Sequence, residues 1–406
     1  MAEQHGKTLV PEIRFSGFTD PWEQRKLGEF GSVAMCKRIY KEQTSEQGDV
    51  PFFKIGTFGA NPDAFISNEL FEDFKCIYPY PTPGTLLISA AGSIGRVVEY
   101  QGEKAYFQDS NIVWLEHDHR LNDAFLKPLY SRIEWGLEGS TIKRLYNKDL
   151  LSAEVTVPGS REQKGIGQFF AKLDNLITLH QRKYDKLCVL KKSMLDKMFP
   201  KGGSLYPEIR FSGFTDPWEQ RKLGGIATFG GGHTPSMSDS DNYEGGNVLW
   251  VTSQDVKSHY LDGTTTQITE KGAKELTLYP AGSLVMVTRS GILRHTLPVA
   301  ELRKPSTVNQ DIRVILPQEK YYGQWLLQFF ISRNKELLLE FGKTGTTVES
   351  VDFSKMRDMV LLTPSLPEQQ RIGHYFARLD NLITLHQRKL ELLRNIKKSM
   401  LDKMFV

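Results

Sequence analysis

The sequence is poor in cysteine and in long apolar runs. Only three of its 406 residues are cysteine, Cys36, Cys76 and Cys188. That number and spacing fit neither a disulfide framework nor a zinc site, so we predict reduced thiols. The apolar runs, such as 283–287, are far shorter than the roughly 20 residues of a membrane span. The first residues contain no apolar signal-peptide core. We therefore expect a cytoplasmic protein with no membrane partner.

Catalytic motifs are missing as well. The sequence contains no Gly-x4-Gly-Lys-Ser/Thr phosphate loop, no His-Glu-x-x-His zinc motif and no Gly-x-Ser-x-Gly nucleophile motif. The stretch 117–119, His-Asp-His, has no further ligand at helical spacing and favours a polar loop over a metal site. The stretch 61–63, Asn-Pro-Asp, lacks the second proline and the aromatic residue of adenine methyltransferase loops. We therefore predict a chain that is not an enzyme and holds no metal.

An internal repeat divides the chain into two tandem halves. The repeated stretches are PEIRFSGFTDPWEQRKLG at 11–28 and 207–224, LDNLITLHQRK at 173–183 and 379–389, and KKSMLDKMF at 191–199 and 397–405. We call 11–28 the first arm and 207–224 the second arm. The interiors between the shared ends differ in sequence. Such a pattern predicts one fold used twice, with different side chains in the two interiors.

The two interiors show the signals of short strands. The runs Asn247–Thr252 and Leu284–Thr288 are rich in β-branched residues, and glycine and proline separate such runs. Helical stretches interrupt them, for example Tyr321–Phe341. Each interior is therefore predicted to be a compact, mostly β mixed domain of about 150 residues.

The tails that begin near Arg161 and Pro367 have apolar residues every seven positions, which is typical of coiled-coil helices. Burying each leucine or isoleucine contributes about 1.5 to 3 kcal/mol, so the apolar stripe needs a partner. Because the tails are near copies, we predict an antiparallel pair with pseudo-twofold symmetry, in which two histidines fix the register. The predicted seam consists of Ile166, Leu173, Leu176, His180, Leu187, Leu190, Ile372, Leu379, Leu382, His386, Leu393 and Ile396.

The basic surplus of the chain lies in these tails. Residues 161–199 contain nine basic and four acidic residues, and residues 368–406 contain eight and four. The remainder has 35 basic and 40 acidic residues, a net charge of −5. Any contact of the interiors with nucleic acid must therefore come from local patches.

Several segments, in this order, carry a family resemblance. They are Trp22–Gly28 and Trp218–Gly224, Gly92–Arg96, Gly231–Ser236 before Trp250–Asp255, and Pro367–Ile372. Together with the repeat, they make the chain resemble the DNA-specificity subunit of type I restriction-modification systems. The resemblance implies an α+β fold with target recognition domains at 1–160 and 204–366. It also implies that two long antiparallel coiled-coil helices, 161–203 and 367–406, separate these domains.

The same resemblance implies a function. Each target recognition domain would recognise one half of a bipartite, asymmetric site on double-stranded DNA, and the chain would have no catalytic activity. Two methyltransferase (M) subunits and the endonuclease/translocase (R) subunits would dock on it. S-adenosylmethionine, ATP and magnesium are expected on those partner subunits and not on this chain.

Candidate DNA contacts follow from the chemistry of base edges and phosphates. Arginine can bind guanine through two hydrogen bonds, glutamine can bind adenine in the same way, and serine, threonine and lysine commonly bind phosphates. The candidates are Lys54, Ser89, Ser93, Arg96, Gln108, Thr252, Ser253, Gln254, Thr288, Arg289, Ser290, Arg294 and Gln310. Two alternatives stay open: a methyltransferase or nuclease with its own target domains, and a coiled-coil scaffold that binds no DNA.

Overall fold

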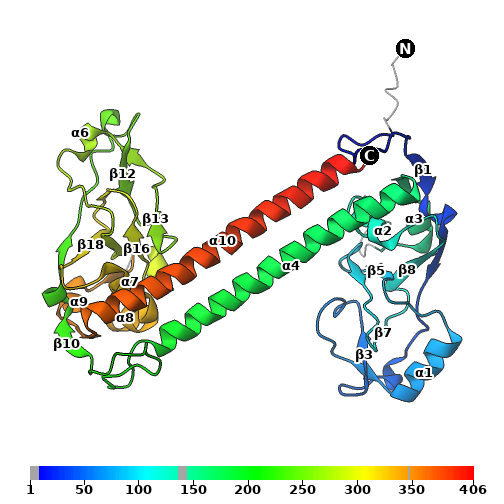
Figure 1. Cartoon of the computed structure of the whole chain (residues 1–406), viewed down its shortest axis with the longest axis horizontal. Coiled ribbons are helices and arrows are strands. Elements are labelled where there is room, and N and C mark those ends of the chain that lie inside the picture. The colour runs from blue at the N-terminus through cyan, green and yellow to red at the C-terminus, as the bar shows by residue number, and fades with distance from the viewer. Residues whose placement is uncertain (1–8, 136–143, 346–347) are drawn as a thin grey trace, which may run out of the picture. The chain divides into compact units, whose positions relative to one another are not determined.

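The computed structural model describes residues 9–135, 144–345 and 348–406, which form two compact units. Unit 1 comprises residues 1–181 and 388–406, and unit 2 comprises residues 182–387. Two long helices, α4 (Ser160–Lys197) and α10 (Leu366–Met404), each contribute a segment to both units (Figure 1). Each unit therefore contains one globular domain and part of both helices.

The domain of unit 1 is built around three small sheets. Their strand orders are β1-β9, β2-β8-β5-β6 and β4-β3-β7. The strands are β1 (Glu23–Lys26), β2 (Gly31–Ala34), β3 (Val50–Phe53), β4 (Phe65–Ile66), β5 (Leu86–Ser89), β6 (Val97–Glu99), β7 (Tyr106–Phe107), β8 (Ile112–His117) and β9 (Glu154–Val157). The helices are α1 (Asn68–Ile77), α2 (Asp123–Tyr130) and α3 (Asn147–Ser152), with short 3-10 turns at Leu27–Glu29 and Lys41–Gln43.

The central strand β5 is buried on both faces, which explains its unbroken apolar sequence. Leu86 and Ile88 point into the core that α2 and the long helices complete, while Leu87 points into a second core beneath β3 and α1. This alternation is the two-residue period of a strand. The four-stranded sheet therefore separates a lobe next to the helices from an outer lobe (Figure 1).

Unit 2 repeats this plan with extra elements. Its strand orders are β10-β21, β11-β18-β15-β16-β13, β14-β12-β17 and β19-β20. The strands are β10 (Glu219–Lys222), β11 (Ala227–Gly230), β12 (Val248–Val251), β13 (Tyr260–Leu261), β14 (Gln267–Ile268), β15 (Leu284–Val287), β16 (Val299–Leu302), β17 (Thr307–Val308), β18 (Ile312–Pro317), β19 (Gly342–Lys343), β20 (Ser350–Val351) and β21 (Val360–Thr363). The helices are α5 (Leu223–Ile226), α6 (Glu270–Ala273), α7 (Gly323–Ser332), α8 (Asn334–Phe341) and α9 (Phe353–Asp358), with 3-10 turns at Ser240–Asn242 and Gly291–Arg294.

The predicted strands 247–252 and 284–288 are confirmed as β12 and β15, each slightly shorter than predicted. The helical stretch predicted at Tyr321–Phe341 is confirmed, and it consists of two helices that meet at Arg333. There the backbone leaves the helical region, and the guanidinium bonds the Pro200 carbonyl and Glu336. The break lets α7 and α8 bury different apolar faces in one core.

The segments of α4 and α10 run in opposite directions within each unit. In unit 1, Asp174 of α4 pairs with Lys397 of α10 at 2.6 Å, and Gln181, later on α4, pairs with the earlier Arg394 at 3.0 Å. In unit 2, Lys191 pairs with Asp380 at 2.6 Å. Phe199, just beyond α4, stacks on Phe376, which precedes Asp380. The antiparallel arrangement therefore holds inside each unit.

Part of the predicted seam is wrong. Leu176 and Leu382 are each 43% exposed, and Leu190 is 39% exposed, so these three leucines lie outside the helix contact. Phe170 and Phe376 are buried instead. In the seven-residue pattern, they occupy the position that directly follows the position of Leu176 and Leu382. At 3.6 residues per turn, a helix that also covers a domain core buries positions four apart in preference to a strict seven-residue seam.

The other predicted seam positions face inward. Those with little exposure are Ile166, Leu173, His180, Ile372 and Leu379, and those that are half-buried are Leu187, His386, Leu393 and Ile396. In the parts of the chain described here, no helix has an apolar stretch long enough to cross a bilayer.

Candidate nucleic-acid interface

Both arms are fixed to their units by the same buried ion pair. Arg14 donates two hydrogen bonds to Glu162 at the start of α4, at 2.6 and 2.7 Å. Arg210 donates two to Glu368 at the start of α10, at 2.7 and 2.8 Å. Glu162 is 2% exposed and Glu368 is 1% exposed. The hydrogen bonds to these carboxylates raise the pKa of both arginines.

Each arm also holds a buried tryptophan against the far end of a long helix. Trp22 packs edge-on against Phe405 in unit 1, and Trp218 packs edge-on against Phe199 in unit 2, both with ring centroids 6.1 Å apart. Phe199 and Phe405 are the last residues of the repeated stretch that ends each half. The residues that the halves share are therefore in contact with one another inside each unit.

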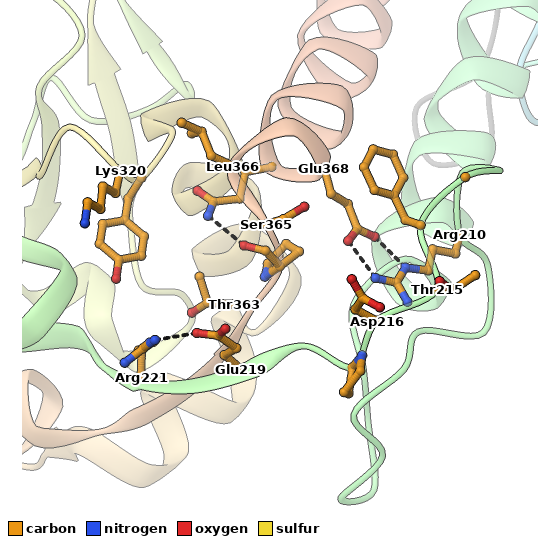
Figure 2. A pocket seen from close by; sticks show the side chains of 16 residues that line it. Arg210, Thr215, Asp216, Glu219, Arg221, Lys320, Thr363, Ser365, Leu366 and Glu368 are labelled. Atoms are coloured by element: carbon orange, nitrogen blue, oxygen red, sulfur yellow. Dashed lines mark hydrogen bonds and ion pairs between the residues drawn. The ribbon is translucent and has the colours of Figure 1, made fainter.

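A polar cavity of about 420 Å³ lies between the second arm, the end of β21 and the start of α10 (Figure 2). Arg210 and Glu368 form one wall, and the exposed pair Glu219–Arg221 lies at its edge. The cavity is therefore lined largely by residues that both halves share. The residues predicted to contact DNA lie elsewhere in the unit.

The candidate contacts of unit 1 gather where three loops meet. We call residues 54–63, 89–96 and 108–111 the first loop cluster. The Gln108 side chain accepts a hydrogen bond from the backbone N–H of Ile55 at 2.9 Å, and Arg96 donates to the carbonyl of Gly59 at 3.2 Å. Lys54, Ser93 and Arg96 are exposed or half-exposed in this cluster, and Lys54 pairs with Asp63 at 2.9 Å.

Ser89, which was predicted to contact DNA, is buried and its hydroxyl is used within the unit. Its side chain is 1% exposed, and its hydroxyl accepts a hydrogen bond from the Arg96 N–H at 3.0 Å while donating to the Ser93 carbonyl. Ser89 therefore closes the turn between β5 and β6. Gly92, at the tip of this turn, has a φ of 65°, a conformation that favours glycine.

The candidates of unit 2 form an equivalent second loop cluster, residues 231–236, 252–255, 288–294 and 309–311. Gln310 accepts a hydrogen bond from the Thr234 hydroxyl at 2.7 Å, which joins two of these loops. Thr288, another predicted DNA contact, is 8% exposed, and its hydroxyl donates to the Asp311 carbonyl at 3.1 Å. Ser253 and Ser290 are half-buried, whereas Gln254, Arg289 and Gln310 are exposed.

Asp255, which the sequence did not single out, organises the loop that carries Thr252, Ser253 and Gln254. Its carboxylate accepts hydrogen bonds from the backbone N–H and the hydroxyl of Thr252, both at 2.8 Å, and from the same two groups of Thr265, both at 2.7 Å. Burial by itself would raise the pKa of Asp255, but these hydrogen bonds outweigh it and lower the pKa. The Thr252 hydroxyl therefore donates its hydrogen bond to Asp255 within the loop.

The arginines of the second loop cluster differ in their partners. Arg294 is 63% exposed and forms an ion pair with Glu349. Arg289 is exposed, and within residues 9–135, 144–345 and 348–406 its side chain has no hydrogen-bond or ion-pair partner. Arg289 is thus the candidate whose guanidinium is fully available to a ligand.

Matching backbone hydrogen bonds align the two loop clusters. Ala90 N–H bonds the Asn111 carbonyl and Thr288 N–H bonds the Asp311 carbonyl, both at 2.8 Å. Gln108 N–H bonds Phe53 at 2.9 Å, as Asn309 N–H bonds Val251 at 3.0 Å. Gln108 is therefore equivalent to Asn309 and not to Gln310.

The first cluster has one more residue in this loop than the second cluster. Between Phe107 and Asn111 lie three residues, whereas two lie between Val308 and Asp311. Ser110, in the longer loop, has a φ of 59°, and no other non-glycine residue that the structure describes has a positive φ. Such strain often marks a functional segment.

Two further arginines contact the first loop cluster and were not predicted. Arg144 donates a hydrogen bond to the Ser110 carbonyl at 2.8 Å, and Arg38 pairs with Asp109 at 2.9 Å. Arg144 lies more than 30 residues after Ser110. No local pattern links such distant positions, so only the fold could reveal this contact.

The stretch 117–119, predicted to be a polar loop, begins at the last residue of β8, His117, and continues into the turn that follows the strand. The His117 ring nitrogen lies 3.0 Å from Asp123, and this hydrogen bond raises the pKa of the histidine. Asp118 pairs with Arg120 at 2.7 Å. Among the residues described, no group of three or more His, Cys, Asp or Glu side chains is placed to hold a metal.

Comparison with known proteins identifies the family. The type I restriction modification DNA specificity domain matches residues 19–188 and 215–395, once in each half. The chain therefore belongs to the family of type I restriction-modification DNA specificity subunits. Both halves carry the family's DNA-recognition domain, and each match includes a loop cluster.

Individual relatives support this assignment. A putative type I restriction enzyme specificity subunit of Haemophilus influenzae is 50% identical over 153 residues, 37% of this chain and 40% of that protein. The specificity subunit of an Escherichia coli type I restriction enzyme is 32% identical over 166 residues, 40% of this chain and 41% of that protein. These alignments thus span about two fifths of both relatives.

A solved structure shares the fold over the full chain. It is the S subunit of a type I restriction-modification system from M. genitalium, with a TM-score of 0.65 and 15% sequence identity. The match covers 98% of this chain and 99% of that one.

Proposed function

We propose that this chain recognises an asymmetric, bipartite site on double-stranded DNA, one half with each loop cluster, and that it holds the other subunits of a type I restriction-modification complex. Two methyltransferase subunits and the endonuclease subunits are the proposed partners. The chain itself carries out no catalysis. A ligand of this kind is chromosomal, so the proposed location is the cytoplasm.

The observation that carries the proposal is the contrast between conserved backbone and changed side chains within one chain. The two loop clusters share backbone hydrogen bonds, as between Ala90 and Asn111 or Thr288 and Asp311, yet they present different residues. Base edges are distinguished by hydrogen bonds from side chains, whereas the shared backbone only positions those side chains. Two such clusters can therefore recognise two different sequences.

The shared residues support identical partners. Both arms have the same sequence and the same ion pair to a helix start, Arg14–Glu162 in unit 1 and Arg210–Glu368 in unit 2. Leu176 and Leu382, at equivalent positions of α4 and α10, are both exposed by 43%. Exposed leucines at repeated positions suit two copies of one partner, because identical surfaces bind identical proteins.

S-adenosylmethionine, ATP and magnesium are assigned by this proposal to the partner subunits. Calorimetric titration of the isolated chain with S-adenosylmethionine tests this assignment directly. Clear binding would favour the alternative of a methyltransferase with its own target domains, and no heat of binding is the expected result.

The decisive experiment is a map of methylated bases in cells that express the complete complex. We expect a motif with two specified halves and an unspecified gap. Replacing residues 29–160 with the interior of a related chain should change one half of the motif and leave the other half as an internal control. A motif unchanged by the exchange would favour a scaffold that binds no DNA.

A further inference from the structure

One residue of each loop cluster forms an isolated antiparallel β-bridge, and the arginine of the bridge lies on opposite strands in the two units. In unit 1 the bridge pairs Ala91 with Arg144, and in unit 2 it pairs Arg289 with Ser350. Flanking hydrogen bonds align the bridges, because Leu145 N–H bonds Ala90 and Val351 N–H bonds Thr288, both at 2.9 Å. Ala91 is therefore equivalent to Arg289, and Arg144 to Ser350.

Each bridge thus carries one guanidinium. It lies next to the loop that follows the parallel strand pair, which is β3 and β7 in unit 1 and β12 and β17 in unit 2. In unit 1, Arg144 is half-buried, and its hydrogen bond to the strained residue Ser110 fixes one of its nitrogens. Among the residues that the structure describes, its remaining side-chain N–H groups have no hydrogen-bond partner, so they can donate to an external acceptor. In unit 2, Arg289 is exposed and unpaired in the described chain.

We propose that Arg144 and Arg289 are equivalent DNA contacts, each of which binds a pair of hydrogen-bond acceptors on DNA in its own half-site. This inference rests on the proposed function and adds Arg144 to the residues expected from the sequence. A guanidinium can bind paired acceptors in two places on DNA, the O6/N7 edge of guanine and two phosphate oxygens.

Local charge supports an anionic ligand at these positions. Around the first bridge, Arg38 and Lys54 are already paired with Asp109 and Asp63, which leaves Arg144 and Arg96 bonded only to carbonyl oxygens. A neutral carbonyl does not cancel the charge of a guanidinium. Counted together with Arg38 and Arg144, the first loop cluster therefore has a net charge of +2, from four basic and two acidic residues, although the interiors as a whole are acidic.

The chain supplies its own well-tolerated variants. Arg144→Ser introduces the residue that unit 2 has at this position, and Ala91→Arg introduces the residue that unit 2 has on the opposite strand. The double variant converts the first bridge into the second. Arg120→Ser is a matched control, because Arg120 lies beyond the other end of β8, where it pairs with Asp118.

The test uses the complete complex and two duplexes, one with the bipartite site found by the methylation map and one with its first half scrambled. Arg144→Ser should weaken binding of the matched duplex on the order of tenfold. Arg120→Ser should not, and the double variant should recover most of the loss. Arg289→Ser should act in the same way through the second half.

The outcomes are separable. Loss confined to the matched duplex assigns Arg144 to a guanine edge. Equal loss on both duplexes, with a salt dependence reduced by about one ion, assigns it to a phosphate. Wild-type binding by Arg144→Ser overturns the inference. Failure of Ala91→Arg to rescue an impaired Arg144→Ser variant also overturns it, because Arg144 would then only hold Ser110 in place. If the unaltered complex neither binds DNA nor methylates a motif, the proposed function itself fails.

Discussion

The ammonium group of Lys191 lies 2.6 Å from the carboxylate of Asp380, and the equivalent residues of unit 1, Lys397 and Asp174, are also 2.6 Å apart. The two pairs differ in burial. In unit 2 the side chains are 12% and 11% exposed, whereas in unit 1 they are 31% and 33% exposed. The Tyr260 hydroxyl of the additional strand β13 donates a further hydrogen bond to Asp380 at 3.1 Å.

Asp380→Ala should therefore destabilise the protein more than Asp174→Ala. Removing one partner of a buried pair costs about 3 to 5 kcal/mol, because the other charge stays buried. A pair that is one third exposed contributes roughly 1 kcal/mol or less. Urea denaturation of both variants, monitored by circular dichroism, compares them. Equal losses would show that β13 adds nothing to the pair.

The arm ion pairs give a second prediction. Glu368→Ala leaves Arg210 largely buried without its carboxylate, so we expect a loss of about 3 to 5 kcal/mol in the stability of unit 2. Glu219→Ala, which removes an exposed partner of Arg221, should change stability by about 0.5 kcal/mol or less. Proteolysis near the second arm should increase only in the first variant. Protection equal to that of the unaltered chain would contradict a structural role for the arm pair.

Acid should loosen the loop that Asp255 organises. Since the folded-state pKa of Asp255 lies below the ordinary value of 3.8, its ionised form stabilises the fold above that pH. This contribution is lost as the pH falls below about 4 and through the lowered pKa. Asp255→Asn should reduce stability at pH 7 and flatten the pH dependence below pH 4. Parallel acid-denaturation curves for the two proteins would refute this assignment.

Leu176→Asp combined with Leu382→Asp tests the proposed docking surface. Both leucines are 43% exposed, so the double variant should fold with a melting temperature close to that of the unaltered chain. Copurification with the methyltransferase subunit should nevertheless be lost, because charges would enter an apolar contact. Phe376→Asp, in the buried face, is the contrasting control and should unfold unit 2. Intact assembly of the double variant would argue against docking at these positions.

Features set by local sequence were predictable. The strand Leu284–Val287 follows from its β-branched run, and the tails are helical because of their apolar spacing. Which leucines face solvent depended on what else each helix covers, so Leu176 and Leu382 were misplaced. Within the loop clusters, residue type suggested Ser89 and Thr288, but their hydroxyls are used in turns that only the fold defines. Arg144 and Asp255 act through partners distant in sequence and had no local signal.

Because Met404 and Phe405 lie in the same core as Trp22, the first half cannot complete its interior from its own residues. Unit 1 needs a segment that leaves the ribosome only after the whole second half has been synthesised. Until then, the surface around Trp22 is expected to stay open and to require protection from aggregation or proteolysis. A nonsense mutation ahead of residue 397 would therefore damage the domain that was translated first.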